Sequence, residues 1–193
     1  MAILSLHPIA QIMQGFDGTA AEAEKRLLAA SVGGVRVVNA YIPNGSSVGS
    51  DKFAGKLEFL ANLRRYFDQH CSTGDPVVLV GDYNVAPAPE DVYDAQQMEG
   101  QVGYHPDERR ALEHLRAWGF HDQFRKFEQG AGFYTWWDYR EGAYPRNAGL
   151  RIDHVWASQP LSERATACVI EREERARPKA SDHVPVIVSY LVD

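Results

Sequence analysis

Cysteine is nearly absent from this chain: only Cys71 and Cys168 occur among 193 residues, far apart and without a CxxC pair. Zinc ribbons and redox-active dithiols need such pairs, and small disulfide-bonded domains need more than two cysteines. We therefore expect two reduced thiols in a cytoplasmic protein, neither of them catalytic.

Long apolar runs and excess positive charge are also missing. No stretch approaches the roughly 20 residues that a membrane-spanning helix needs, and residues 1–8 lack the basic start and long apolar core of a secretory signal. Lys and Arg number 20 against 26 Asp and Glu, which gives a net charge of −6. This balance argues against a protein that coats nucleic acid non-specifically, but it leaves room for an enzyme with a locally basic groove.

What is present is ordinary globular composition, with 45% hydrophobic and 24% charged residues. The length fits one large domain, and no linker, repeat or low-complexity tract divides it, so we expect a single domain over residues 1–193. Strands outnumber helices and the two mix, which predicts an α+β fold with helices covering stacked sheets. The pattern predicts strands at 2–5, 35–42, 76–80, 150–157, 165–172 and 183–191, helices at 50–70 and 106–118, and a surface loop at 15–26.

The strongest local signal lies between Pro76 and Asn84. Four apolar residues indicate a strand buried on both faces, and Gly81 ends it. Asp82 and Asn84 then stand two residues apart, so in extended backbone their side chains would point the same way. An acid beside an amide suits the activation of water or the binding of a hard cation near a phosphate. Taken alone, however, these residues are better explained by a simple Asx turn.

Two further clusters combine polar and aromatic groups. Residues 39–45 close a strand with the phenol of Tyr41 and the amide of Asn44, which either contact phosphate oxygens or simply end the strand in a turn. Residues 134–140 contain four aromatic side chains. Because Trp136 and Trp137 are adjacent, at least one of them is expected to face a cleft or solvent, where it suits stacking on a sugar or base. Core packing is the competing explanation for Trp137.

An acid and a histidine complete the set. Asp153 is flanked by apolar residues on a predicted strand and therefore needs a partner, whereas His154 points to the opposite face and is expected to be structural. Asp182 and His183 precede the last strand. A histidine in that place is more often a sheet-end residue than a catalyst, but paired with Asp153 it becomes an oriented imidazole suited to a phosphate site.

In their order along the chain, these motifs resemble the exonuclease III family of abasic-site endonucleases, part of the endonuclease/exonuclease/phosphatase superfamily. The resemblance runs with short gaps from about residue 2 to residue 190, through NAYIPNG, KFAGKLEFL, GDYN, YTWWDYR, GLRIDHV and SDHVPV. It implies a layered α/β/β/α sandwich and a DNA-repair hydrolase.

The resemblance also implies catalytic roles. Asp82 with Asn84 would position and deprotonate the attacking water. His183, oriented by Asp153, would sit on the scissile phosphate, which Tyr41 would also contact.

It further implies binding roles. Asn44 would contact the phosphate, and Trp136 would wall the pocket for a base-less deoxyribose. Arg140 and Asn147 would lie along the groove of double-stranded DNA. Asp182 would lie at the metal end of the site, where Mg²⁺ or Mn²⁺ would neutralise charge on the phosphate in the transition state.

The chain departs from the family pattern at its start. The family opens with a strand bearing a Trp-Asn pair, followed by a Gln-Glu-Thr segment whose Glu is the principal metal ligand. Residues 1–34 contain neither Trp nor Asn, and their acids are Asp17, Glu22 and Glu24. The chain therefore looks like a member without the opening strands and helix, and we expect the sandwich to be N-terminally incomplete.

Two functional hypotheses follow. The first is a Mg²⁺-dependent phosphodiesterase, cytoplasmic and nucleoid-associated, that acts on DNA at abasic sites and 3′ ends. The second is a remnant or fragment that keeps DNA-facing residues but cleaves poorly or not at all. A phosphorylated lipid or small molecule as substrate is weaker, because Trp136 and the basic residues near it favour DNA.

Overall fold

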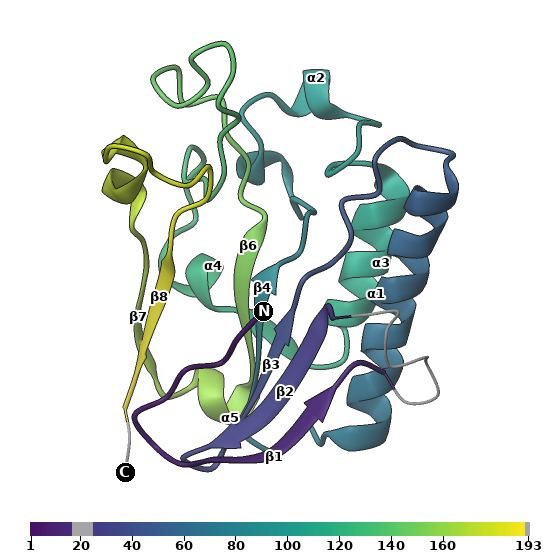
Figure 1. The fold of residues 1–193 in the computed structure, drawn as a ribbon, viewed down its shortest axis with the longest axis vertical. Helices are drawn as coiled ribbons and strands as arrows, with labels where there is room; N and C mark the ends of the chain where they lie inside the picture. The colour runs from purple at the N-terminus through teal and green to yellow at the C-terminus, as the bar shows by residue number, and fades with distance from the viewer. Residues whose placement is uncertain (17–24, 192–193) are drawn as a thin grey trace.

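Strand β4 (Val77–Asp82) lies inside a six-stranded sheet, as its apolar sequence predicts. The structure, a computed structural model, describes residues 1–16 and 25–191 (Figure 1). The strand order is β1-β2-β3-β4-β6-β5. β3 and β4 run parallel, and the other neighbouring pairs are antiparallel. The remaining strands of this sheet are β1 (Ile9–Gln14), β2 (Leu27–Val32), β3 (Val35–Ala40), β5 (Phe120–Asp122) and β6 (Asp153–Ser158).

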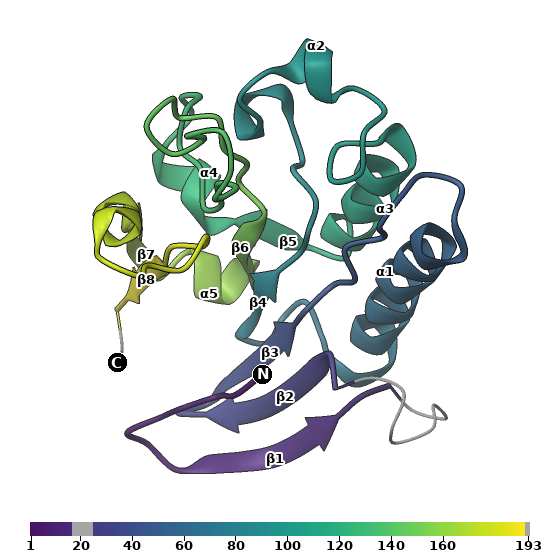
Figure 2. The same cartoon turned by 45° about the horizontal axis from the view of Figure 1, so that its top comes forward.

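Two long helices cover one face of this sheet. α1 (Asp51–His70) and α3 (Pro106–Arg116) lie side by side there (Figures 1 and 2), and their apolar side chains form the main core with those of β2, β3 and β4. α1 begins after Ser50, whose Oγ accepts a hydrogen bond from the backbone N of Phe53 at 3.2 Å. Both predicted helices are therefore present, each starting within a residue of the expected position.

A smaller sheet lies on the opposite face. β7 (Ala165–Ile170) and β8 (Val186–Tyr190) form an antiparallel pair, and Tyr190 packs against the apolar cluster on that side of the large sheet. The other elements are short: α2 (Ala95–Met98), α4 (Gln123–Phe127), α5 (Gln159–Ser162) and the 3₁₀ helices η1 (Pro89–Asp91) and η2 (Arg172–Ala176). Helices layered over two sheets confirm the predicted α+β class.

Gly81 lets β3 and β4 approach closely near the end of the buried strand. Its φ is +133°, and a Cβ atom at this position would lie 2.0 Å from the carbonyl oxygen of Ala40. No other residue type fits there without moving the β3 backbone. The glycine therefore allows the two parallel strands to end together, which brings the loops that follow them to the same edge of the sheet.

The expected strand at residues 2–5 is wrong. That segment pairs with no strand, and the hydrogen bond from Nδ2 of Asn39 to the carbonyl oxygen of Ala2, at 3.1 Å, connects it to the sheet. The first strand is instead β1, which pairs with β2, and the sequence patterns indicate neither of them. Most of the loop expected at 15–26 lies outside the described residues.

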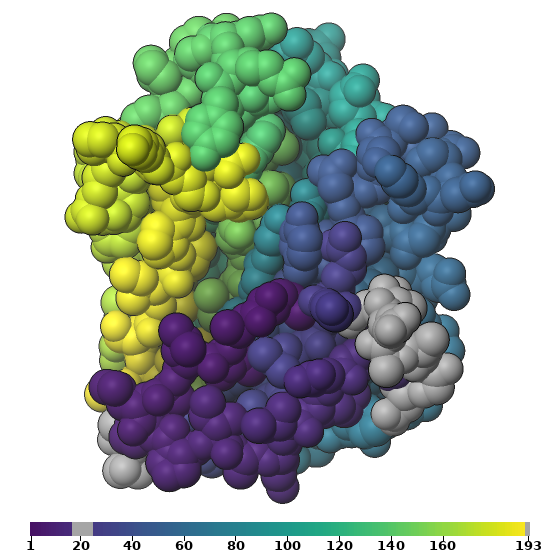
Figure 3. Space-filling view, viewed as in Figure 1, coloured from purple at the N-terminus to yellow at the C-terminus, as the bar shows by residue number. Residues whose placement is uncertain are grey.

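The start of the chain crosses the front of the molecule beside β8, as the space-filling view shows (Figure 3). Leu4 and Leu6 are almost fully exposed there, at 93% and 103%. Among the described residues, no helix combines the length and apolar character needed to cross a bilayer.

Candidate active site

The turn after β4 joins Asp82 to Asn84. Asn84 adopts a left-handed conformation (φ +52°), so its side chain folds back on Asp82 instead of running parallel to it. The two carboxylate oxygens of Asp82 accept hydrogen bonds from the backbone N and from Nδ2 of Asn84, at 2.8 and 2.9 Å. The Asx turn is thus present, and it fixes the carboxylate at the end of the buried strand.

Asn44, in the loop after β3, reaches the same point. Its Nδ2 donates a hydrogen bond to Oδ1 of Asn84 at 3.1 Å, and Nδ2 of Asn84 also donates to the carbonyl oxygen of Ile42 at 3.0 Å. The structure therefore brings Asp82, Asn84 and Asn44 together, two amides and one carboxylate, where the parallel strands β3 and β4 end.

The neighbouring strand β6 supplies a second carboxylate. Asp153 is the first residue of β6 and lies opposite Asp82 in the antiparallel register. Its Oδ2 accepts a hydrogen bond from Nδ1 of His183 at 2.8 Å. The imidazole accordingly carries a proton on Nδ1, which leaves Nε2 for another partner. The partner that the sequence requires for Asp153 is His183, which comes from the loop before β8.

Electrostatics around Asp82 favour its protonated form. Burial raises the pKa of Asp82 to about 6, and the nearby charge of Asp153 acts in the same direction. The backbone N–H of Asn84 and the positive charges of His183 and Lys56 oppose this shift. Asp82 therefore titrates close to neutral pH, which suits a group that takes a proton from water.

The acids around His183 likewise favour the protonated form of its imidazole. Burial alone would lower the pKa of His183, but the hydrogen bond and charge of Asp153, together with the charges of Asp82 and Asp182, raise it above its ordinary value. These acids thus favour the imidazolium form, which attracts anions.

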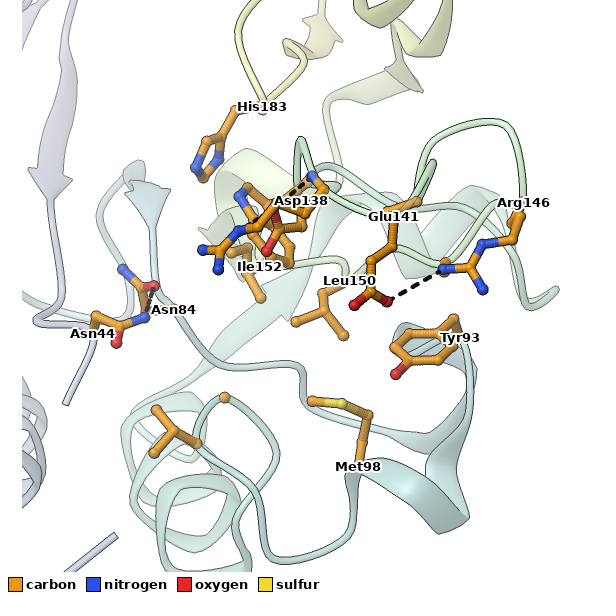
Figure 4. Close-up of a pocket in the computed structure, with 16 residues that line it drawn as sticks. Asn44, Asn84, Tyr93, Met98, Asp138, Glu141, Arg146, Leu150, Ile152 and His183 are labelled. Carbon is orange, nitrogen blue, oxygen red and sulfur yellow. Dashed lines mark hydrogen bonds and ion pairs between the residues drawn. The ribbon is translucent and has the colours of Figure 1, made fainter. Parts of the chain in front are cut away.

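A pocket of about 470 Å³ lies beside these groups. Asn44, Asn84 and His183 line one end of it, and charged side chains including Glu141 and Arg146 line the other (Figure 4). Between them lie apolar side chains, namely Met98, Val102, Trp136, Leu150 and Ile152. The pocket therefore offers polar groups at one end and a largely apolar wall beside them.

Trp136 and Asp182 are bonded to each other beside this pocket. The indole Nε1 of Trp136 donates to Oδ2 of Asp182 at 3.0 Å, and the backbone N of Trp137 donates to the carbonyl oxygen of Asp182 at 3.0 Å. Trp137 is fully buried. Of the two adjacent tryptophans, Trp136 is thus the one that faces the cleft, and Trp137 belongs to the core.

No three His, Cys, Asp or Glu side chains gather as metal ligands in the described part of the chain. Each acid of the site has a protein partner: Asn84 for Asp82, His183 for Asp153 and Trp136 for Asp182. Asp17, Glu22 and Glu24 lie outside the residues that the structure describes.

Three predicted residues lie further out. Tyr41 is 42% exposed and packs beneath the guanidinium of Arg26, 4.6 Å from its ring centroid, with no recorded bond to the other site residues. Asn147 uses its amide inside the protein, accepting from Nε1 of Trp137 and donating to the carbonyl oxygen of Gly132. Arg140 lies at the pocket rim. The predicted contacts of these residues with a substrate stay predictions.

Two buried residues of this region, Thr135 and Arg151, were not predicted from the sequence, and Thr135 supports the backbone of Asp153. The Oγ1 of buried Thr135 accepts hydrogen bonds from the backbone N atoms of Ile152 and Asp153, both at 3.0 Å. Buried Arg151 donates to Asp91 at 2.6 Å and to Asp122 at 2.8 Å. Thr135 has no distinguishing sequence signal, but a charge between apolar neighbours marks Arg151 as clearly as it marks Asp153.

His154 is structural, as its position on the opposite face predicts. It is buried, its Nδ1 lies 3.0 Å from NH1 of Arg151, and its Nε2 lies 3.1 Å from the carbonyl oxygen of Val85. Since the guanidinium only donates and the carbonyl only accepts, His154 is neutral with its proton on Nε2.

Comparison with known proteins gives a consistent result. Residues 1–183 match the model of the Endonuclease/Exonuclease/phosphatase family. The chain is 32% identical to exodeoxyribonuclease III of Haemophilus influenzae over 202 aligned positions, which cover 98% of this chain and 76% of that protein.

Two solved structures are similar over nearly the whole chain. An AP endonuclease from Archaeoglobus fulgidus superposes with a TM-score of 0.92 at 35% identity, covering 97% of this chain and 73% of that one. A 3′ phosphatase from Neisseria, bound to a product DNA hairpin, superposes with a TM-score of 0.91 at 33% identity over the same shares.

Proposed function

The chain belongs to the endonuclease/exonuclease/phosphatase family and, within it, to the exonuclease III family, and from this membership we propose that it hydrolyses phosphodiester bonds of double-stranded DNA at abasic sites and 3′ ends. One observation carries the proposal. Asp82 and Asn84 come from the turn after β4, Asp153 from β6 and His183 from the loop before β8, and these three segments converge beside one end of a pocket with an apolar wall.

The convergent groups have complementary tasks. Asp82, with its pKa raised to about 6, accepts a proton from the attacking water, and Asn84 holds the carboxylate in place for it. His183 presents Nε2 to the phosphate, while Asp153 fixes the ring and stabilises its charge. Asn44 donates from the same end. Preorganised donors and positive charge aimed at a developing anion are the largest source of catalysis in such reactions.

A divalent cation fits the chemistry of this end of the pocket. Carboxylate and amide oxygens are ligands of Mg²⁺ and Mn²⁺, and Mg²⁺ is commonly held by one or two carboxylates with water and substrate phosphate completing its shell. We assign Asp182 to this role, because Trp136 holds its Oδ2 at 3.0 Å, whereas its Oδ1 accepts a long hydrogen bond of 3.5 Å from Oγ of Ser181. When bound, the cation supplies neutralisation of charge on the reacting phosphate.

The apolar wall supports the proposed preference for a site without a base. Trp136, Leu150 and Ile152 suit the apolar face of a deoxyribose turned out of the duplex. The rim carries Arg140 and Arg146, which suit the phosphates of the flanking backbone. Each guanidinium also lies near an acid of the same rim, Arg140 at 3.3 Å from Asp138 and Arg146 at 3.9 Å from Glu141, so the rim carries paired charges of both signs.

The proposal is tested with a duplex that contains one tetrahydrofuran residue in place of a nucleotide. With Mg²⁺ we expect a single nick beside this residue, and separately the release of phosphate or nucleotides from a duplex 3′ end. The intact duplex of the same sequence is the control. Binding to the abasic duplex without any cleavage would instead support the remnant that holds DNA but does not cut.

Removal of the cation is a second test. We expect EDTA to abolish nicking and excess Mg²⁺ or Mn²⁺ to restore it, while Ca²⁺ supports binding with little cleavage, because it does not impose the tight octahedral geometry of Mg²⁺. Nicking that persists at full rate after exhaustive chelation would contradict the proposed dependence on a cation.

A further inference from the structure

Lys56 is a charged residue in the apolar stripe of α1. It lies within the KFAGKLEFL motif, in line with Phe53, Leu60 and Leu63, and its side chain is 0% exposed. Lysine is almost never fully buried unless it is paired. None of the catalytic or DNA-binding roles proposed above uses this residue, so its burial needs another explanation.

The ammonium group of Lys56 makes three hydrogen bonds, one for each of its protons. Nζ donates to the carbonyl oxygen of Asn44 at 3.1 Å, to that of Asn84 at 2.7 Å and to Oε1 of Glu108 at 2.5 Å. Two of these three acceptors are the backbones of the residues whose side-chain amides meet at the pocket end. The group is therefore satisfied by the site loops rather than by its own helix.

Glu108, on α3, extends this connection to a third loop. Its Oε2 accepts hydrogen bonds from the backbone N atoms of Gly103 and His105, at 2.8 and 3.0 Å. The two side chains thus tie the loops after β3, after β4 and before α3 to one buried point. Gly103 itself lines the pocket.

Two residues beside Lys56, Asn84 and Gly45, have positive φ angles. Asn84 is left-handed, with φ +52°, and it directs its carbonyl inward to Nζ. Gly45 has φ +93°, and a Cβ atom there would lie 3.2 Å from Cδ of Lys56. The carbonyl bond of Asn84 is buried and that of Asn44 partly buried, and carbonyls in irregular backbone shielded from water need a donor, which an apolar residue in this position would not supply.

Stability alone does not account for the buried pair. Removing two charges from water costs about as much as their attraction returns, and apolar replacements of similar volume are often neutral or stabilising. What an apolar pair cannot do is bond the carbonyls of Asn44 and Asn84. The contacts therefore point to positioning.

We propose that Lys56, balanced by Glu108, is a positioning residue for the phosphate end of the pocket: its ammonium fixes the backbones of Asn44 and Asn84, and through them the bonded pair of side-chain amides. The expected effect on kcat rests on the proposed function, whereas the expected effect on the positions of the two amides does not. Loss of the hydrogen bonds from Lys56 to these two backbones displaces groups that act on the transition state. It therefore lowers kcat more than it raises KM.

The kinetic experiment compares Lys56→Met with Leu63→Ala. Leu63 is also fully buried on α1, and its truncation destabilises the protein without touching the site loops. At a temperature where circular dichroism shows both variants folded, we expect Lys56→Met to lower kcat on the abasic duplex about 100-fold, with KM changed less than about threefold. Leu63→Ala should keep kcat within about threefold of the unchanged protein.

A spectroscopic readout is independent of activity. The chain has five asparagines, Asn39, Asn44, Asn62, Asn84 and Asn147, so selective ¹⁵N labelling gives a readily assigned set of side-chain amide signals. In Lys56→Met we expect the signals of Asn44 and Asn84 to shift or broaden and those of Asn62 and Asn147 to stay. In Leu63→Ala the Asn44 and Asn84 signals should stay.

The outcomes separate the two proposals. If the unchanged protein does not cleave DNA, the proposed function fails, but the amide signals still test whether Lys56 positions Asn44 and Asn84. Unmoved Asn44 and Asn84 signals in Lys56→Met, or a kcat no lower than that of Leu63→Ala, would overturn the positioning role. If Lys56→Met does not fold, Lys56→Gln replaces it, because glutamine keeps a hydrogen-bond donor on a shorter side chain. We then expect kcat to decrease about 10-fold. Unmoved amide signals, or a kcat no lower than that of Leu63→Ala, would again overturn the proposal.

Discussion

The two histidines near the start of β6 show how hydrogen bonding decides what an imidazole can do. His154 is buried and uses both ring nitrogens inside the protein. His183 uses only Nδ1, on Asp153, and lines the pocket. A ring with one nitrogen fixed and the other open is oriented but still able to bond a ligand, so only His183 suits a catalytic role.

Asp82 gives the first prediction at this scale. Asp82→Ala removes the proposed proton acceptor, and we expect cleavage of the abasic duplex to fall by about 10²–10⁴-fold. DNA affinity should change little, because the carboxylate makes its recorded bonds within the protein. Single-turnover cleavage and fluorescence anisotropy measure the two quantities. Asp68→Ala, an acid removed from the exposed side of α1, is the matched control; lost binding with retained cleavage would refute the assignment of Asp82.

His154 gives a pH-dependent prediction of stability. Burial, followed by the positive charge of Arg151, lowers the pKa of His154 from 6.5 to about 4. Between these pH values the unfolded chain binds a proton that the folded chain refuses, so the free energy of unfolding falls as pH decreases from 6.5 to 4. The loss from this residue amounts to about 3 kcal/mol.

Urea unfolding at several pH values measures this effect. The fall in stability between pH 6.5 and 4 should be smaller in His154→Gln, because the proton uptake of the unfolded chain at that position is gone. His114→Gln alters an exposed histidine on α3 and should keep the profile of the unchanged protein. Equal pH dependence in all three proteins would contradict the prediction.

Part of the site could be predicted from single residues, because a charged group among apolar neighbours must have a bonding partner. A carboxylate such as Asp153 among apolar neighbours requires a partner, and a histidine in a distant loop supplies it. Tyr41 and Asn147 could not be placed in this way, because the direction of an exposed phenol or a loop amide depends on backbone detail. Asn147, with φ +53°, serves its own loop.

At the scale of elements, the parallel pairing of β3 and β4 depends on Gly81. Gly81→Ala introduces a Cβ atom where the carbonyl oxygen of Ala40 lies 2.0 Å away, at φ +133°, and we expect a loss of about 2–4 kcal/mol of stability. Gly55→Ala, in the second turn of α1 with open space around the new methyl group, should instead gain about 0.5–1 kcal/mol. Thermal or urea unfolding measures both, and a Gly81→Ala protein as stable as the unchanged one would show that β3 yields easily.

Helices and strands with a regular pattern of apolar residues and recognisable capping or turn residues at their ends could be predicted from the sequence. The others could not. α1 has an apolar stripe and a Ser50 cap, α3 begins at Pro106, and β4 is a run of β-branched residues. β1 and β2 contain Ala, Ser and Gln in place of such runs, and β1 is exposed on nearly every residue. Its place in the sheet comes from pairing with β2 rather than from burial, so no apolar alternation marks it.

At the scale of the whole molecule, we propose that residues 1–193 unfold as one cooperative unit. The large sheet packs against α1 and α3 on one face and against β8 on the other, so neither layer is complete alone. Far-UV circular dichroism and the fluorescence of Trp118, Trp136, Trp137 and Trp156 should therefore give coincident urea transitions. Two separated transitions would show that the β7–β8 pair and its loops form an independent part.

The crossover from β3 through α1 to β4 also has a consequence for biosynthesis. Asn44, Lys56 and Asn84 all belong to this one continuous stretch, whereas Asp153 and His183 are translated much later. Because a polypeptide leaves the ribosome N-terminal residues first, Asn44, Lys56 and Asn84 emerge before Asp153 and His183 have been made. We therefore expect the nascent chain to lack the complete site until β6 and the loop before β8 have emerged.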